Sequence, residues 1–396
     1  MIPRGLQSEV AKLRKGYPAI AITGPRQSGK TTLAQLSCPD LPYVNFESPL
    51  ERADFDADPL GFLDRFPDGG IFDEAQHVPD LLSYLQVRID AERKVGRYIL
   101  TGSQQLEIDR GVSQSLAGRV ALLELLPLSH AELCAAEIAP RSLADAVFRG
   151  SYPVLFDATR EVAPTRWLED YLATFINRDV RQIVEVKNRT AFDRFVRLCA
   201  ARTGQAFNAS GLASECGVNH MTIRSWMSVM EACYLIRLLR PYYRNFGKRL
   251  VKAPKLYFID SGLACRLLHI ADVNQLKSHP LWGALVETWC VGDAIKARLN
   301  RGLSPAAWYW RSSDGLEIDL LFETGAGLVP LEVKSAVTPR REFVQSIEKF
   351  RTLSDREPEV TVLPGTVIYG GDEPRSSGAD RFASWRSIES SIPDRP

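Results

Sequence analysis

Residues 24–31 read G-P-R-Q-S-G-K-T and follow the apolar run A-I-A-I at 19–22, with only Thr23 between them. This order predicts a short strand, a glycine-rich loop and a helix that begins near Lys30. Glycines in such a loop let successive backbone N–H groups converge on phosphate oxygens, and the helix N-terminus adds partial positive charge. The stretch therefore predicts a phosphate-binding loop in an α/β fold built on a parallel sheet.

Individual residues of this loop have separate roles toward a nucleoside triphosphate. Lys30 supplies positive charge to the β and γ phosphates, and the Thr31 hydroxyl is a ligand for Mg²⁺. ATP and Mg²⁺ are therefore the predicted ligands. The predicted nucleotide contacts in the loop are Gly24, Pro25, Arg26, Gln27, Ser28, Gly29, Lys30, Thr31 and Thr32.

An acidic pair ends the next apolar run, G-I-F-D-E at 70–74. A loop that binds phosphate does not by itself indicate hydrolysis, which also needs a metal-holding acid and a group that activates water. We expect Asp73 to support Mg²⁺ and Glu74 to polarise the attacking water. The alternative is an exposed acidic turn without a catalytic role.

A third strand, Y-I-L at 98–100, leads into the polar residues T-G-S-Q at 101–104. The carboxyl ends of parallel strands meet at one edge of the sheet, where ligands bind. Ser103 or Gln104 is therefore placed to sense the γ phosphate. Polar residues after a strand are also ordinary turn formers, and this alternative stays open.

Several stretches resemble prokaryotic AAA-type ATPases that carry a C-terminal domain of the family DUF4143, over nearly the whole chain. They are residues 24–31, I-F-D-E-A-Q at 71–76, I-L-T-G-S-Q at 99–104, L-A-G-R at 116–119 and Y-F-I-D-S-G-L at 257–263. The resemblance implies an ATPase of the P-loop NTPase fold. It also implies that Arg119 stabilises charge on the transferred phosphate, in its own subunit or a neighbouring one of a homo-oligomer. A plain surface arginine is the alternative.

The composition of the 396-residue chain is that of a globular protein with about two or three domains. Hydrophobic residues make up 45% and charged residues 24%, and no apolar stretch approaches the length of a membrane span. The seven cysteines are scattered without a C-x-x-C pair, so the sequence predicts neither a zinc site nor a disulfide framework. We expect a cytoplasmic protein without a membrane partner.

Positive charge is concentrated in the middle of the chain. Residues 181–255 hold 14 Lys or Arg against 4 Asp or Glu, although the net charge of the whole chain is only +1. Within this stretch, 211–217 and 219–235 read as a helix-turn-helix. The second helix presents Asn219, His220, Thr222, Arg224 and Ser225, while Ile223, Met227, Met230 and Leu235 face inward.

Residues 238–258 read as a two-stranded wing with basic residues around its turn at Gly247. The cluster consists of Arg244, Asn245, Lys248, Arg249, Lys252 and Lys255. Lysine and arginine at such a turn bind phosphates, which predicts DNA as a partner. The alternative is that the module packs between domains and that its basic face is only solvated.

The last third of the chain contains a second group of acidic residues. Residues 308–311, 316–323 and 328–334 read as three strands separated by S-S-D-G and T-G-A-G turns. Side chains alternate along a strand, so Glu317 and Asp319 share one face, and Glu332 and Lys334 also point together. The sequence therefore predicts an acidic pocket that contains one lysine.

This arrangement resembles the core of PD-(D/E)xK nucleases, although the leading proline of that motif is absent. The resemblance implies that Asp319 and Glu332 hold Mg²⁺, that Glu287 supports a second metal or a water, and that Lys334 orients the attacking water. The alternative is plain salt bridging among Asp319, Glu332 and Lys334. A fold of this kind survives the loss of its activity, so cleavage does not follow from the fold.

These placements predict a P-loop ATPase core at 1–128, a helical connector at 129–180, a winged helix-turn-helix at 181–268 and a restriction-endonuclease-like α/β domain at 271–386. The function that fits is an ATP-hydrolysing, DNA-associated protein with a metal-dependent nuclease site. A non-nucleolytic, ATP-dependent regulatory or interaction protein is the first alternative. A small-molecule kinase is the second, although nothing in the sequence resembles an acceptor-binding lid.

Overall fold

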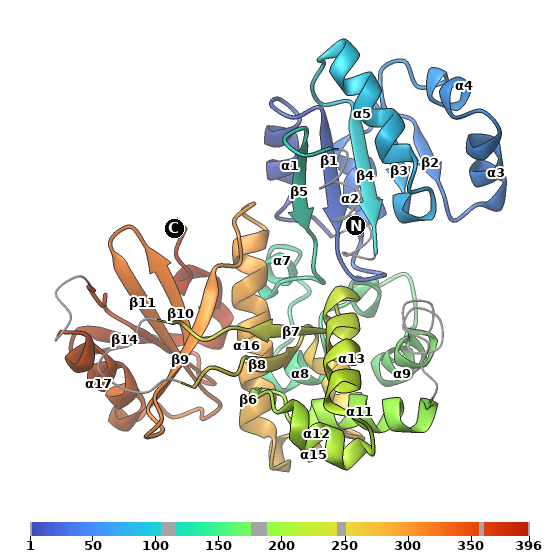
Figure 1. The fold of residues 1–396 in the computed structure, drawn as a ribbon. Helices are drawn as coiled ribbons and strands as arrows, with labels where there is room; N and C mark the ends of the chain where they lie inside the picture. Colours follow the sequence, from blue (N-terminus) through green and yellow to red (C-terminus); the bar gives the residue numbers. More distant parts are fainter. Residues whose placement is uncertain (1, 104–115, 176–187, 244–250, 356–359, 395–396) are drawn as a thin grey trace. The chain divides into compact units, whose positions relative to one another are not determined.

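A computed structural model describes residues 2–103, 116–175, 188–243, 251–355 and 360–394 (Figure 1). The chain forms two compact units. The first consists of Met1–Leu128 with Leu299–Gly302, and the second of Ser129–Arg298 with Leu303–Pro396. Both units combine helices with sheets, which confirms the α/β fold class.

The first unit is built on a five-stranded sheet in the order β2-β3-β4-β1-β5, and all its strand pairs are parallel. The parallel sheet predicted from the sequence is therefore confirmed. Its strands are β1 (Ala19–Thr23), β2 (Tyr43–Asn45), β3 (Gly70–Asp73), β4 (Tyr98–Gly102) and β5 (Val120–Glu124). The helices of this unit are α1 (Gln7–Leu13), α2 (Lys30–Ser37), α3 (Pro49–Ala57), α4 (Pro59–Asp64) and α5 (Leu81–Glu92).

Strand β1 is buried along its whole length because β4 and β5 flank it. Its side chains alternate between two apolar clusters, Ala19 and Ala21 entering one and Ile20 and Ile22 the other. A strand covered on both faces reads as a continuous apolar run, which explains why A-I-A-I precedes the loop. The loop is therefore anchored at the end of a fully buried strand.

The second unit begins with a helical region around a small sheet of order β6-β8-β7. The strands are β6 (Gln205–Ala206), β7 (Ile236–Leu239) and β8 (Lys255–Phe258), and both pairs are antiparallel. The helices are α7 (His130–Ala135), α8 (Leu143–Arg149), α9 (Pro164–Phe175), α11 (Arg189–Ala201), α12 (Ala209–Cys216), α13 (His220–Ala232), α14 (Ser261–Leu267) and α15 (Val273–Ser278).

Helices α12 and α13 occupy the stretch where the sequence predicted two helices and a turn. The turn contains Gly217 in the left-handed region, with φ of 68°, and Asn219 caps α13 by accepting a hydrogen bond from the backbone N–H of Thr222. The four side chains expected to face inward are all buried: Ile223, Met227, Met230 and Leu235.

A six-stranded mixed sheet in the order β13-β14-β12-β11-β10-β9 forms the rest of the second unit. Its strands are β9 (Ala307–Arg311), β10 (Glu317–Thr324), β11 (Gly327–Lys334), β12 (Thr366–Tyr369), β13 (Arg375–Ser377) and β14 (Asp380–Ser384). The three strands predicted in this region are confirmed as β9, β10 and β11. Helix α16 (Trp282–Leu299) precedes them, and α17 (Gln345–Ser354) follows β11.

The parts of the chain that the structure describes contain no helix that is both long enough and apolar enough to cross a membrane.

Candidate functional site

The phosphate loop joins the end of β1 to the start of α2. Gly24 adopts φ of 150°, and a Cβ atom there would lie 2.1 Å from the backbone oxygen of Leu125. Gly29 caps α2 in the left-handed region with φ of 95°. Both positions therefore require glycine, one for close backbone approach and one for its conformation. The two fixed glycines of the motif follow from this local geometry.

Lys30 is buried, and its ammonium group is folded back onto the loop. Its Nζ atom donates to the backbone oxygens of Gly24 at 3.0 Å and Pro25 at 2.9 Å. Burial lowers the pKa of Lys30 to about 8, although the nearby carboxylates of Glu74 and Asp73 act in the opposite direction. The ammonium is thus held inside the loop whose N–H groups are expected to meet phosphate.

Asp73 ends β3 and gathers three hydroxyl groups. Thr31 Oγ1 lies 3.0 Å from each of its carboxylate oxygens, Tyr43 donates to Oδ2 at 2.8 Å, and Thr101 donates to Oδ1. Hydroxyl and carboxylate oxygens are the protein ligands that Mg²⁺ prefers. The donor set around Thr31 and Asp73 therefore fits that ion. Tyr43 was not predicted, because no motif spacing marks it, whereas Thr101 belongs to the T-G-S-Q stretch that was expected at this edge of the sheet.

Glu74 follows directly and adopts a left-handed backbone conformation with φ of 54°. Its Oε2 atom accepts hydrogen bonds from Ser103 at 3.0 Å and Gln76 at 2.5 Å. Burial alone would raise the pKa of Glu74, but the charge of Lys30 and these hydrogen bonds lower it overall. The carboxylate is thus ionised and fixed in direction, as a water-polarising group must be.

The structure brings Ser103 into the same group of residues, at the end of β4. Gln76 also donates to Ser103 at 3.3 Å, so the side chains of Glu74, Gln76 and Ser103 are all hydrogen-bonded to one another. The role of Gln76 was missed, although it stands in the I-F-D-E-A-Q stretch. Gln104, the other candidate for this position, lies outside the described residues.

The remaining loop residues differ in exposure. Arg26 pairs with Glu47 at 3.2 Å, and Gln27 adopts φ of 63°. Ser28 is fully buried, and its hydroxyl makes no hydrogen bond within the described part of the chain. Thr32 is exposed on α2. A buried hydroxyl without a partner at this position is an unsatisfied polar group of the kind a bound ligand satisfies.

Arg119 lies just before β5, at the amino-terminal ends of the strands, whereas the phosphate loop lies at their carboxyl ends. Its backbone oxygen accepts a hydrogen bond from the backbone N–H of Ala19, at the start of β1, whereas the loop follows the end of that strand. With about 3.3 Å per strand residue, β1 separates the two by roughly 13 Å. The guanidinium pairs with Asp90 at 2.6 Å. The structure therefore does not bring Arg119 to the phosphate loop of its own chain.

A different arginine contacts the loop. Arg4 is only 8% exposed and donates to the backbone oxygens of Ser28 at 2.6 Å and Leu126 at 2.7 Å. It thereby ties the phosphate loop to the segment that follows β5. Sequence reasoning missed it, because a single arginine near the N-terminus carries no spacing signal.

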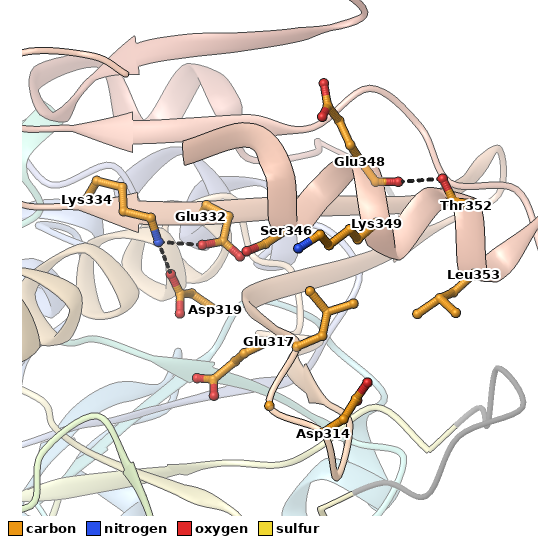
Figure 2. A pocket seen from close by; sticks show the side chains of 12 residues that line it. Asp314, Glu317, Asp319, Glu332, Lys334, Ser346, Glu348, Lys349, Thr352 and Leu353 are labelled. Atoms are coloured by element: carbon orange, nitrogen blue, oxygen red, sulfur yellow. Dashed lines mark hydrogen bonds and ion pairs between the residues drawn. The ribbon is translucent and has the colours of Figure 1, made fainter. Parts of the chain in front are cut away.

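The second unit contains a cavity of about 730 Å³, lined by residues of β10, β11 and α17 and of the turn before β10 (Figure 2). Lys334 lies between two carboxylates there, at 2.6 Å from Glu332 Oε2 and 4.0 Å from Asp319 Oδ2. The backbone N–H of Val333 also donates to Asp319 Oδ2 at 2.9 Å. The structure thus brings together Asp319, Glu332 and Lys334, as the strand alternation indicated.

A second lysine, Lys255, lies between Glu287 of α16 and Asp319 and contacts both carboxylates. Lys255 Nζ lies 2.8 Å from Glu287 Oε1 and 3.7 Å from Asp319 Oδ1, and it also pairs with Glu317. Lys255 is 2% exposed, so the expectation that it belongs to a DNA-binding basic cluster is wrong. The strand that carries it turns its side chain into the acidic group, which sequence spacing does not reveal.

The charges of this group are strongly coupled. Burial, followed by the charge of Asp319, raises the pKa of Glu287 to about 7 and that of Glu332 well above its ordinary value. Burial lowers the pKa of Lys255, but Tyr257, Glu287 and the other carboxylates raise it by more, so the ammonium stays protonated. The carboxyl groups therefore lie so close together at a buried site that each disfavours ionisation of the others.

Oxygens of Glu287, Glu317 and Asp319 lie within 4.8 Å of one another, close enough to hold one cation. Three carboxylates are a donor set that fits Mg²⁺ or Mn²⁺. Glu317, which was not predicted as a ligand, belongs to this group of three, and the Oε1 atom of the predicted ligand Glu332 is buried without a hydrogen bond within the described residues. Both residues line the same cavity as Asp319.

The basic module is described only in part. On α13, His220, Arg224 and Ser225 are exposed, whereas Asn219 is engaged as the helix cap, accepting from the backbone and hydroxyl of Thr222. Lys252 is exposed. Arg244, Asn245, Lys248 and Arg249 lie outside the described residues.

Comparison with protein families divides the chain into three matches. Residues 16–134 match the model of an AAA domain, AAA_14. Residues 140–274 match a domain of unknown function, DUF8612, and residues 282–386 match another, DUF4143.

Relatives and solved structures add to these matches. The chain is 32% identical over 336 residues to Uncharacterized protein Rv2008c of Mycobacterium tuberculosis and to Uncharacterized protein Mb2031c of Mycobacterium bovis, covering 83% of this chain and 74% of each relative. The Walker-type ATPase PABY2304 of Pyrococcus abyssi is 14% identical with a TM-score of 0.45, over 68% of this chain and 96% of that structure. AMPPCP-bound DnaA of Aquifex aeolicus is 14% identical with a TM-score of 0.31, over 57% and 85%. From the family matches and the extent of the identity to these relatives, the chain belongs to the AAA-type P-loop ATPases that carry a C-terminal DUF4143 domain.

Proposed function

We propose that the first unit hydrolyses ATP at the carboxyl edge of its sheet, with the residues that the loop and β3 bring together. The observation that carries this proposal is the contact of Thr31 with Asp73, 3.0 Å from hydroxyl to carboxylate. Thr31 and Asp73 would hold Mg²⁺, which neutralises charge on the β and γ phosphates when bound. Lys30 contributes the second positive charge.

Glu74 polarises the attacking water in this proposal. Its ionised carboxylate accepts hydrogen bonds through Oε2, which fixes its direction and leaves Oε1 to accept from a water. Ser103 at the end of β4 donates to Oε2 of Glu74 and would sense whether the γ phosphate is present. Arg119 lies at the far edge of the sheet, so any action on a phosphate is on the nucleotide of a neighbouring copy in a homo-oligomer.

The ATPase proposal is tested by comparing ATP turnover and ATP binding in the wild type and Glu74→Gln. We expect Glu74→Gln to retain affinity for ATP while turnover falls by about two orders of magnitude, the typical contribution of a general base. Glu51→Gln is the matched control, because Glu51 is a half-exposed glutamate on α3 of the same unit. Equal turnover in Glu74→Gln and the wild type would refute the assignment.

We infer that the second unit associates with DNA through α13 and the basic segment that leads to β8. The exposed side chains of His220, Arg224 and Ser225, the exposed Lys252 and the local excess of positive charge support this inference. The measurement is DNA binding by the intact protein at low salt. Absence of binding under that condition would end this part of the proposal.

We also propose metal-dependent cleavage of phosphodiesters at the acidic cavity, with Asp319, Glu287 and Glu332 as acids and Lys334 as the residue that orients water. Cleavage in Mg²⁺ or Mn²⁺ that is lost in Glu332→Ala supports it. The two lysines favour a second candidate, a non-nucleolytic ATP-dependent regulator, because they already neutralise part of the acidic group. That candidate predicts ATP turnover without any metal-dependent cleavage.

A further inference from the structure

Lys255 occupies the position among the carboxylates where a cation is expected. Its ammonium contacts Glu287, Glu317 and Asp319, the same three residues whose oxygens converge within 4.8 Å. A metal ion and the ammonium cannot share this space, because both need the same oxygens and repel each other. Occupation by one therefore excludes the other.

The position of Lys255 is fixed by the strand that carries it. Lys255 begins β8, between β6 and β7, where it is opposite Ala206 on one side and Leu239 on the other. The hydroxyl of Tyr309, in β9, donates to the backbone oxygen of Ala253 and ties the preceding residues to the six-stranded sheet. The backbone of Lys255 is thus held in place by β6 on one side and by β7 on the other, and the residues before it by Tyr309.

Aromatic groups complete the surroundings of the ammonium. Its Nζ atom lies 5.6 Å from the ring centre of Tyr309 and 5.9 Å from that of Tyr257. The Tyr257 hydroxyl donates to Glu287 Oε1 at 2.5 Å, the oxygen that Lys255 also contacts. An exposed surface lysine has no such shell, so this lysine is a built part of the site.

A second observation concerns Glu332, which lies beside this group of carboxylates. Glu332 is 2% exposed, and its Oε1 atom has no hydrogen bond within the described residues, although it lines the same cavity as Asp319 and Glu317. Asp319 links the two halves, with Oδ1 toward Lys255 and Oδ2 toward Lys334 (Figure 2 shows the second half). The carboxyl of Glu332 therefore keeps one buried oxygen that neither lysine contacts.

We propose that Lys255 is an internal cation that closes the acidic site, and that a divalent metal binds Glu287, Glu317 and Asp319 only when the Lys255 side chain is withdrawn. This proposal rests on the proposed metal-dependent function of the cavity and adds its regulation.

The test measures Mn²⁺ affinity without nucleotide, by electron paramagnetic resonance of free Mn²⁺ or by calorimetry, on the full chain. We expect Lys255→Met to bind Mn²⁺ at least tenfold more tightly than the wild type, and the double variant Lys255→Met with Asp319→Asn to lose this gain. Lys277→Met is the matched control, an exposed lysine at the end of α15. Unchanged affinity in folded Lys255→Met would overturn the proposal.

Removing the buried ammonium leaves Glu287 without its lysine and leaves Glu317 and Asp319 only with Arg311 at 3.1 Å and Lys334 at 4.0 Å, so Lys255→Met is expected to be less stable without metal. The melting temperature of this variant then rises on addition of Mn²⁺ by more than that of the wild type. Lys255→Arg keeps a cation at this position, so it is expected to bind Mn²⁺ no better than the wild type. A gain in Lys255→Arg equal to that in Lys255→Met would contradict the proposal.

Cleavage assays on the same variants separate this proposal from that of the nuclease. Tight Mn²⁺ binding by Lys255→Met without cleavage by any variant would retain the internal cation and reject the nuclease. Cleavage by the wild type that Lys255→Met slows, with no change in Mn²⁺ affinity, would make Lys255 a catalytic residue and reject the internal cation.

Discussion

The hydroxyl of Thr31 lies 3.0 Å from both carboxylate oxygens of Asp73, although the two residues belong to different elements of the sheet's carboxyl edge. Since the loop and β3 share this contact, the metal-dependent part of ATP binding depends on both. We expect Thr31→Val to weaken binding of ATP with Mg²⁺ roughly tenfold, about 1.4 kcal/mol, while binding in EDTA changes little. Titration of a fluorescent ATP analogue in both conditions measures this difference.

Thr31→Ser is the control for that experiment because it keeps the hydroxyl and removes only a methyl group. It retains the Mg²⁺-dependent share of the affinity. A Thr31→Val variant whose affinity falls equally in Mg²⁺ and in EDTA would instead show that Thr31 supports the loop and not the metal.

Lys30 places a buried ammonium group in the loop, where it donates hydrogen bonds to the backbone oxygens of Gly24 and Pro25. Lys30→Ala is expected to reduce ATP affinity by at least tenfold, since it removes the buried positive charge of the motif. Lys12→Ala is the matched control, because the Lys12 side chain is 75% exposed on α1 of the same unit. Retention of wild-type affinity by Lys30→Ala would remove the loop from the proposed mechanism.

Arg4 donates hydrogen bonds to the backbone oxygens of Ser28, in the phosphate loop, and Leu126, after β5. These two residues do not share a sequence motif. We expect Arg4→Met to lower the free energy of unfolding by about 1.5–3 kcal/mol, the usual range for hydrogen bonds to a charged group. ATP affinity falls as well, because the loop loses a support. Urea unfolding and ATP titration check both effects against the exposed Lys15→Met. Lower stability with full ATP affinity would limit Arg4 to a purely structural role.

The strands and the phosphate loop were predictable because each has a local signal. The run A-I-A-I at 19–22 is continuous since β1 is covered on both faces, and the alternation of 316–323 placed Glu317 and Asp319 together on β10. Both signals come from backbone periodicity, which the chain carries in neighbouring residues. These elements and the shared face of Glu317 and Asp319 therefore followed from sequence alone, whereas β2, β6 and β12 to β14 were not predicted.

The residues that sequence reasoning missed act over long separations in the chain. Lys255 meets Glu287 and Asp319 only through the pairing of β8, and its composition-based interpretation as a DNA-binding lysine was wrong. Arg4 and Tyr43 reach their partners without any fixed spacing. Single charged or polar residues carry no periodic signal, so their partners are fixed by tertiary structure.

DNA association is tested by changing the basic segment. Replacing Lys248, Arg249 and Lys252 together with alanine is expected to weaken DNA binding and to reduce its dependence on salt, by about 0.9 in the logarithmic slope for each phosphate that is no longer neutralised. Binding is measured by fluorescence anisotropy over a series of salt concentrations. Lys277→Ala serves as the control, since Lys277 is exposed in the same unit but outside the segment. An unchanged slope in the triple variant would place DNA elsewhere or exclude it.

The titration of His130 is expected to appear in the pH dependence of the free energy of unfolding. His130 is buried against Trp289 and Trp385. Burial, with smaller contributions from Arg386 and Lys296, lowers the pKa of His130 to about 4 from an ordinary value of 6.5. Between these two values the unfolded chain binds a proton that the folded chain does not. The contribution of neutral, buried His130 to the free energy of unfolding is therefore fully present above pH 6.5. It is lost as the pH drops toward 4, by about 3 kcal/mol in total.

His130→Gln removes this titration, so we expect the free energy of unfolding of the wild type to fall more steeply than that of the variant between pH 6.5 and 4. Burial raises the pKa of the neighbouring Asp293 to about 6, and this residue acts in the opposite direction, gaining stability as the pH falls. The Asp293 effect is common to both proteins, because its partner at residue 130 is the backbone N–H, which glutamine retains. The difference between the two urea-unfolding series thus isolates His130. His220→Gln, at an exposed position on α13, is expected to follow the wild type. Parallel curves for the wild type and His130→Gln would contradict the prediction, because they would show that the pKa of His130 is the same in the folded and unfolded chains.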